Sequence, residues 1–446
     1  MKNFYIIIVL MISSLLTAQE KQEQYAFTLE EAIAHALKNN YQVVNAERNI
    51  ESAIKKKWET TAIGLPQIDA SLNYQNNFEI QKSLVPAEFF GGNPGEFAEV
   101  AFGTKHNMVA NATLRQLIFD GSYLVGLQSA KVYLQISENA KEKTDLEIRE
   151  MVINAYGNVL LANESVNVLK SNKTSLEKTL YEITQIYKNG LTEEESVEQL
   201  QITLSQINSS LSYATRRANI SLDMLKFVLG IDLDNTLQLK DNLDQLALKN
   251  IDLAATTSTF NINDNIDYKI ELNTLKSNEL LVKLEKSKYL PSLGAQVNFG
   301  YNSFSNDFSF LQSDQKWLNY SYLGVGLNVP IFSSFARSSR VQQAKIAYEK
   351  AETNLKQTEQ NLRLQFETVK NEYQFSIEQY TVSKENLRLA ERIEHKQGVK
   401  FQEGISSSFE FTEAQRQLYA AQQSFLEAMV NVINKKTALD KIINNN

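Results

Sequence analysis

The residues best able to do chemistry are few in this sequence and lie far apart. The three histidines are His35, His106 and His395, and their spacing matches no metal-binding motif such as HExxH. The chain has no cysteine, which excludes disulfides and thiolate metal sites. It also lacks a nucleophile elbow, a phosphate-binding loop and a convergent pair of carboxylates in an apolar setting. We therefore expect no enzyme, and neither a cofactor nor a metal.

The charge balance argues against a nucleic-acid partner. The formal net charge of the 446 residues is -7, and the pI is near 5.4. The sequence has no basic block that would neutralise a phosphate backbone.

The first residues predict a secretory signal peptide. Lys2 precedes an apolar run from Phe4 to Ile12, and small residues follow up to Ala18. The run is shorter than the ~20 residues of a spanning helix, so we expect cleavage after Ala18 rather than a membrane anchor. No later segment is long and apolar enough to be a transmembrane helix.

The elements that follow occur twice, in the same order. A proline follows a helix in each copy, at Leu65-Pro66 and at Leu290-Pro291. An Ile-Phe pair follows a strand, at Ile118-Phe119 and at Ile331-Phe332. A glycine follows a long helix, at Gly190-Leu191 and at Gly404-Ile405. Internal repetition of this kind indicates a duplicated structural unit.

The period of the hydrophobic pattern changes within each copy. Thr28 and Glu31 form a capping-box pattern that predicts a helix from Leu29 to about Lys38, and a second helix should run from Tyr41 to Ile63. Proline then ends the helix. The segments after each proline alternate between apolar and polar residues, which predicts two strands per copy.

A very long helix is predicted after each strand pair. The segment from Ser122 to Asn189 has no proline and would measure roughly 100 Å at 1.5 Å per residue. Its lower half carries apolar residues at alternating steps of three and four, interrupted only by Lys173, which indicates coiled-coil packing. These positions are Val152, Ala155, Val159, Ala162, Val166, Leu169, Lys173, Leu176, Leu180, Ile183 and Tyr187. Gly190 and Gly404 should turn each long helix into a hairpin.

The strands have the length and two-faced character of transmembrane β-strands. The alternative is a pair of ordinary hairpins packed on a soluble core. Four strands cannot close a membrane barrel, since the smallest barrels of this kind have about 8. Open edges in lipid cost several kcal/mol per unpaired group, so two or more chains would have to pool their strands.

These motifs together resemble the TolC family of outer-membrane efflux and secretion channels. The resemblance covers nearly the whole chain beyond the signal peptide and rests on the opening helix, the two Leu-Pro motifs, the strand-to-helix junction and the tip glycines. The residues concerned are Phe27 to Ile33, Leu65-Pro66, Leu290-Pro291, Gln116 to Gly121, and Gly190 and Gly404. Each motif is weak alone, and their order, repeated twice, makes the match specific.

The resemblance implies a mainly α fold with membrane β-strands. Three chains would form a 12-stranded β-barrel in the outer membrane, continuous with an α-helical barrel in the periplasm. It implies a homotrimer surrounded by outer-membrane lipid, with a periplasmic adaptor protein and an inner-membrane transporter as partners. The drug, metal or protein that such a duct carries is not indicated by these residues.

The resemblance also suggests two kinds of site. At the hairpin tips Gly190, Leu191 and Thr192, and likewise Gly404, Ile405 and Ser406, would contact the adaptor, although the glycines could serve only the tight turn. Glu410 and Glu413 lie three apart on one helical face, and three chains would bring their carboxylates into a pore constriction that attracts cations. The alternative is a solvated helix face.

The main rival interpretation is a secreted or periplasmic coiled-coil scaffold or adhesin without a pore. It accounts for the heptads and leaves the duplicated strand pairs unexplained. The expected organisation is a signal peptide at 1–18, a first repeat at 27–232, a connecting equatorial segment at 233–261 and a second repeat at 262–446. The first repeat comprises a β-hairpin at 67–120, a long helix at 122–189, a tip at 190–192 and a return helix at 193–228. The second comprises the corresponding elements at 291–332, 335–403, 404–406 and 408–443.

Overall fold

The computed structural model describes residues 24–257 and 259–443, so the predicted signal peptide lies outside the described residues. The chain divides into two compact units. The helical unit comprises the described residues within Met1–Asn49, Ser137–Glu271 and Leu355–Asn446, and the sheet unit comprises Ile50–Ile136 and Leu272–Asn354.

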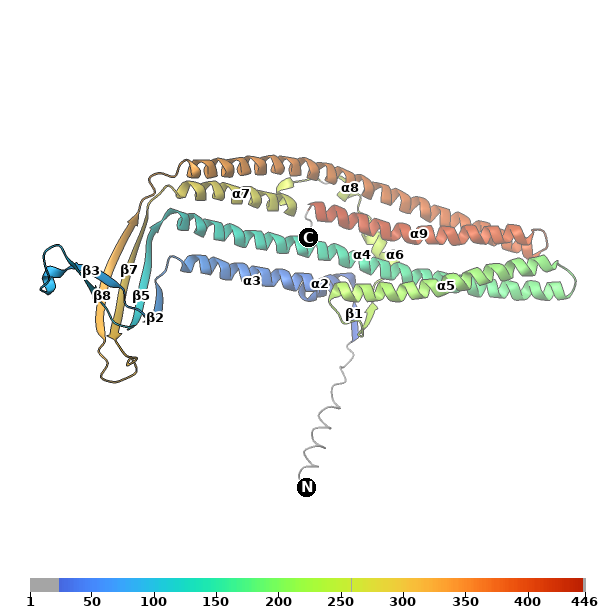
Figure 1. Ribbon diagram of the computed structural model, residues 1–446. Helices are drawn as coiled ribbons and strands as arrows, with labels where there is room; N and C mark the ends of the chain where they lie inside the picture. The colour runs from blue at the N-terminus through green and yellow to red at the C-terminus, as the bar shows by residue number, and fades with distance from the viewer. Residues whose placement is uncertain (1–23, 258, 444–446) are drawn as a thin grey trace, which may run out of the picture. The chain divides into compact units, whose positions relative to one another are not determined.

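Long helices dominate the chain (Figure 1). The α-helices are α2 Leu29–Asn39, α3 Tyr41–Ala62, α4 Gly121–Lys188, α5 Glu194–Leu229, α6 Leu243–Lys249, α7 Ile266–Ser287, α8 Ala336–Gln402 and α9 Ser408–Ile443. Short 3-10 turns lie at Ala87–Phe90, Ala254–Thr257 and Ile262–Asp264. The strands are β1 Gln24–Phe27, β2 Gln67–Asn76, β3 Lys82–Pro86, β4 Phe97–Ala101, β5 His106–Asp120, β6 Thr236–Leu239, β7 Ser292–Ser305 and β8 Leu318–Asn328.

The helical unit begins with the predicted capping box. The Thr28 side chain accepts a hydrogen bond from the Glu31 amide, and the Glu31 carboxylate accepts one from the Thr28 amide. These bonds satisfy amide groups that the first turn of α2 would otherwise leave unpaired.

The heptad positions of α4 supply much of the core of the helical unit. Val152, Val159 and Val166 are buried at one position of the heptad, and Leu176 and Ile183 are buried at the other. The last two belong to a cluster with apolar residues of α5, α8 and α9, at the end of the helices where both hairpins turn. The spacing of three and four therefore marks the buried side of the helix.

Two buried tyrosines fasten the middle of the chain to the long helices. The Tyr156 hydroxyl of α4 donates to the carboxylate of Asp241 at 2.8 Å and lies 3.0 Å from the carbonyl oxygen of Phe27. On α8, the Tyr373 hydroxyl donates to the Asn250 carbonyl oxygen at 2.7 Å and accepts from the Asp252 amide at 2.8 Å. The predicted connecting segment 233–261 thus has an ordered path that includes β6 and α6.

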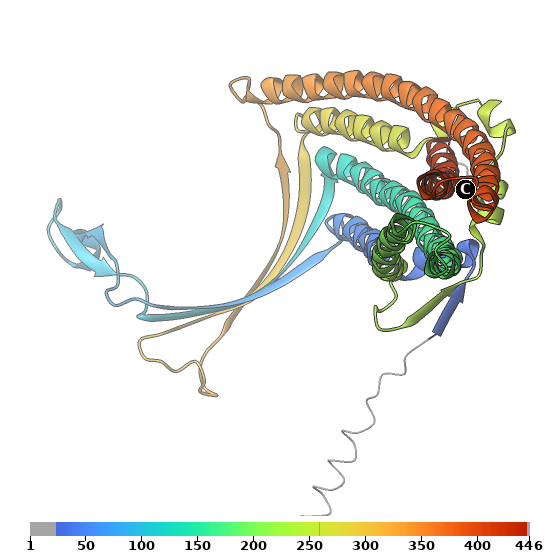
Figure 2. The same cartoon turned by 90° about the vertical axis from the view of Figure 1, so that its right-hand side faces the viewer.

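The sheet unit holds one antiparallel sheet with the strand order β2-β5-β7-β8. The two strand pairs expected from the sequence are joined through β5 and β7, and the four strands form one continuous curved sheet (Figure 2). The long connection between β2 and β5 contains a second, smaller hairpin, in which β3 pairs with β4.

Candidate functional site

The four-stranded sheet separates apolar and polar side chains onto opposite faces. Because neighbouring residues in a strand point to opposite sides, the register decides which side chains share a face. Ile68 pairs with Leu114, Leu114 with Val297, and Val297 with Leu323, so an apolar row crosses all four strands. The adjacent row consists of Asp69, Thr113, Asn298 and Tyr322.

The apolar face is open in the single chain. Ile68 is 71% exposed, Leu323 70% and Val325 65%. The outer edges of β2 and β8 have no strand paired with them among the described residues. A sheet that exposes both an apolar face and two edges is incomplete in water, and is suited to contact with lipid and to further strand pairing.

The polar face is linked by hydrogen bonds between strands. Asn298 donates to the Thr113 hydroxyl at 2.6 Å, the Ser71 hydroxyl donates to Asn111, and Arg115 forms an ion pair with Asp69. Amides and hydroxyls therefore account for most of this face.

The two hairpin tips have the same backbone structure. Gly190 has φ 73° and Gly404 has φ 71°, a region that favours glycine. The Leu191 amide donates to the Ile186 carbonyl oxygen at 3.1 Å, and the Ile405 amide donates to the Lys400 carbonyl oxygen at 2.8 Å. This is the Schellman pattern, which closes a helix by satisfying its last carbonyl groups.

The side chains after each tip glycine point into open space. Leu191 and Ile405 are each 77% exposed, whereas Thr192 and Ser406 are half-buried. Both tips belong to the helical unit and lie at the same end of its helices (Figure 1). The Gln402 amide near the second tip donates to Glu182 near the first at 3.4 Å, so the structure brings the six predicted tip residues to one region.

Glu410 and Glu413 lie just after the second tip and have partners within the chain. The Glu410 carboxylate accepts hydrogen bonds from the Ser406 hydroxyl at 2.7 Å and the Ser407 amide at 3.1 Å. These bonds hold the pKa of Glu410 below its ordinary value. Glu413 forms an ion pair with Arg416 at 2.6 Å. Glu410 thus caps α9, and the charge of Glu413 is balanced locally.

A partly buried polar cluster connects α8 and α9 near the second tip. Glu394 lies beside Tyr419 and Gln415, and burial is the main cause that raises its pKa. Burial also raises the pKa of Tyr419 to about 12. Gln415 is 2% exposed and its Oε1 has no hydrogen-bond partner. The sequence interpretation missed this cluster, because Glu394 resembles the exposed glutamates around it.

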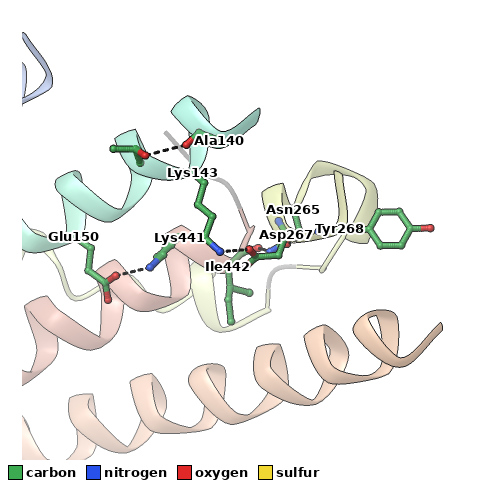
Figure 3. A network of polar contacts seen from close by, with 9 residues as sticks. Ala140, Lys143, Glu150, Asn265, Asp267, Tyr268, Lys441 and Ile442 are labelled. Carbon is green, nitrogen blue, oxygen red and sulfur yellow. Dashed lines mark hydrogen bonds and ion pairs between the residues drawn. The ribbon is translucent and has the colours of Figure 1, made fainter. Parts of the chain in front are cut away.

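A network of ion pairs joins α4 to α7 and α9 in the middle of the helical unit (Figure 3). Lys143 pairs with Asp267 at 2.7 Å, and Lys441 pairs with Glu150 at 2.7 Å. The hydrogen bond to Asp267 raises the pKa of Lys143. The Asn265 amide also donates to the Ile442 carbonyl oxygen near the end of α9, at 3.0 Å. The two ion pairs join the second repeat to the first, and no local sequence motif predicts them.

The described part of the chain has no group of three or more His, Cys, Asp or Glu side chains that could hold a metal ion. Within the same residues, none of the helices combines the length and the apolar character needed to span a bilayer.

Comparison with known proteins identifies the family. The model of the family described as "Outer membrane efflux protein" matches residues 32–231 and 274–445. Outer membrane protein TolC of Vibrio cholerae is 20% identical over 418 residues, which cover 92% of this chain and 89% of TolC.

Solved structures of outer-membrane channels have the same fold. The outer membrane protein VceC of Vibrio cholerae has a TM-score of 0.70 at 15% identity, covering 93% of this chain and 95% of VceC. The CmeC outer membrane channel of Campylobacter jejuni has a TM-score of 0.71 at 19% identity, covering 93% of this chain and 85% of CmeC. With the family model matched over most of its length, the chain belongs to the outer membrane efflux protein family, and it is an outer-membrane protein whose helical part lies in the periplasm.

Proposed function

We propose that this chain is the outer-membrane exit duct of a tripartite efflux or type I secretion system. Three copies would pool their four-stranded sheets into a 12-stranded barrel. The long helices would line a periplasmic tunnel that receives substrate from an adaptor and an inner-membrane transporter.

The observation that carries this proposal is the one-sided sheet with two open edges. The apolar face would meet lipid tails, and the polar face would line water. Each unpaired backbone group at an edge in lipid would cost several kcal/mol, which strand pairing between copies removes. The rival scaffold or adhesin gives this sheet no role.

The exposed tip residues support contact with an adaptor. Gly190 and Leu191 match Gly404 and Ile405 in backbone hydrogen bonding, and Thr192 and Ser406 follow them at the two tips. Two apolar side chains held rigidly outward on tight turns are ready to enter pockets of a partner at little entropic cost.

The second tip also supports a constriction at the periplasmic end. Glu410 and Glu413 were both expected to contribute, and Arg416 already balances the charge of Glu413. We therefore propose Glu410 as the main source of negative potential, with Glu413 adding charge when its pair with Arg416 opens.

Disulfide crosslinking tests the assembly directly, because the chain has no cysteine of its own. Single cysteines along β2 are combined with single cysteines along β8, and the purified protein is oxidised in detergent. We expect covalent trimers at one strand register and ion conductance of the protein in a planar bilayer. A purified protein that stays monomeric and soluble without detergent contradicts the proposal.

A second experiment tests the tips. Leu191→Asp and Ile405→Asp should abolish crosslinking to the adaptor in intact cells while the protein still reaches the outer membrane. Leu248→Asp is the control, since Leu248 is also exposed but lies on α6, away from the tips. Equal crosslinking in all three variants would remove the tips from the adaptor contact.

A further inference from the structure

The polar face of the sheet carries few charges for a surface that lines a channel. Among the residues of β2, β5, β7 and β8, all of which are described, the side chains with a full charge at neutral pH are Asp69, Arg115 and Asp120. Asp120 ends β5, where its carboxylate accepts the Tyr123 amide at 2.9 Å and so caps α4. Asp69 and Arg115 are therefore the charges within the sheet itself.

These two residues form an ion pair across neighbouring strands. The guanidinium of Arg115 contacts the Asp69 carboxylate, and the side chains are 59% and 62% exposed respectively. Arg115 is diagonal to Asp69 in the register, since Asp69 pairs with Thr113 and Gln67 pairs with Arg115. Both side chains lie on the polar face, within the reach that diagonal neighbours allow.

The surface of the sheet is hollowed beside Arg115. A hollow next to Arg115 is lined by Gln296 and by glycines of β7 and β8, namely Gly294, Gly324 and Gly326. A Cβ placed on Gly326 would meet nothing within 4 Å. Because these glycines have no side chains, the Arg115 guanidinium projects beyond the adjacent surface of β7 and β8 on the polar face.

We infer that the Asp69–Arg115 pair keeps the barrel section of the channel electrically neutral, so that solutes of either charge pass through it. This inference rests on the proposed function, which makes the polar face the channel wall. A lone charge in a pore with low-dielectric walls focuses the field and selects ions by sign. An adjacent opposite charge cancels most of that field and leaves hydrogen-bonding amides and hydroxyls to meet the solute.

The inference is tested by removing one charge at a time. Asp69→Asn should leave Arg115 unbalanced and shift the reversal potential in a KCl gradient toward anion selectivity. Arg115→Gln should shift it in the opposite direction, and the double variant should restore the value of the unmodified channel. Dilute salt is used, since the Debye length grows from about 10 Å at 0.1 M to about 30 Å at 0.01 M.

The β3–β4 hairpin offers a matched control. Lys82 and Glu99 form an ion pair at 3.0 Å, are both 63% exposed, and lie outside the four-stranded sheet. Glu99→Gln and Lys82→Gln should leave the reversal potential unchanged. The exchanged pair, Asp69→Arg with Arg115→Asp, should behave like the unmodified channel even if a single variant assembles poorly.

The outcomes separate this inference from the proposed function. If the unmodified protein forms no channel, the proposed function fails. If it conducts and the single variants keep the same reversal potential, or shift it in the same direction, the neutral-pair inference is overturned and the exit-duct proposal stands. A purely structural role for the pair would lower the stability of the oligomer without opposite shifts in ion selectivity.

Discussion

The helical unit buries many apolar side chains within the chain, whereas the sheet unit exposes many of its own. Leu225 of α5 and Val152 of α4 are completely buried within the chain, whereas Leu323 of β8 is 70% exposed. The helical unit therefore forms its core from its own residues. The sheet unit leaves its apolar surface exposed in the single chain, as the proposed contact with lipid requires.

The largest expected effect is a truncation in the helical core. Leu225→Ala should destabilise the folded protein by about 2 to 5 kcal/mol, because a buried cavity is created. In the same detergent, Leu323→Ala should cost much less, since most of its side chain touches no other protein atom and its removal leaves no cavity. Urea unfolding followed by helical circular dichroism measures both. Equal costs would show that the two surfaces are buried alike.

A lysine placed on either face of the sheet tests the same difference between the two units. Leu323→Lys should hinder membrane insertion, at about 2 to 4 kcal/mol for a lysine at the bilayer midplane. Tyr322→Lys, one residue away on the polar face, should insert almost normally. The fraction of protein that resists extraction from lipid vesicles gives the measurement. Similar losses for both substitutions would argue against a one-sided membrane sheet.

Removing a buried hydroxyl in the helical unit should have an intermediate effect. Tyr373→Phe keeps the ring and leaves the Asn250 carbonyl and the Asp252 amide without their partner, at a cost of about 1 to 3 kcal/mol. Tyr213→Phe is the control, because Tyr213 is 62% exposed. The urea midpoints of the two variants should differ clearly, and coincidence would mean that water replaces the Tyr373 contacts.

The smallest effect concerns the pH dependence of the helical unit. Burial raises the pKa of Glu394, so the folded state holds this proton more tightly than the unfolded state. Its contribution to stability is therefore present at low pH and is lost as pH rises from the ordinary glutamate value through the raised one. Glu394→Gln, which stays neutral, should flatten that decline in urea midpoints measured between about pH 4 and about pH 7. Glu391→Gln on the same helix should retain it.

The sequence predicts those parts of the fold that depend on local chemistry. The capping box of Thr28 and Glu31 is confirmed because its bonds join residues three apart. Alternation predicted that each strand has an apolar and a polar side, since this needs only the geometry of a strand. The family resemblance, drawn from short motifs in a repeated order, is confirmed by the family model.

Features that depend on distant residues could not be predicted in this way. Alternation shows which side of its strand a residue occupies, but it does not identify the strand that pairs with it. The central pairing of β5 with β7 was therefore missed. The partners of Lys143 and Glu394 lie on other helices. The local sequence does not distinguish such a residue from a solvent-exposed charge on a long helix. At the candidate site, Arg416 was overlooked as the partner of Glu413. The roles of the tips and of Glu410 remain predictions.

The pairing of β1 with β6 has a consequence for the order in which the protein assembles. These strands are parallel, and the Leu29 amide donates to Asp241, 212 positions later. Contacts so distant in sequence form slowly, because a long loop must close before they contribute. Strand β1 can therefore pair with β6 only after the whole of the first repeat between them has been synthesised.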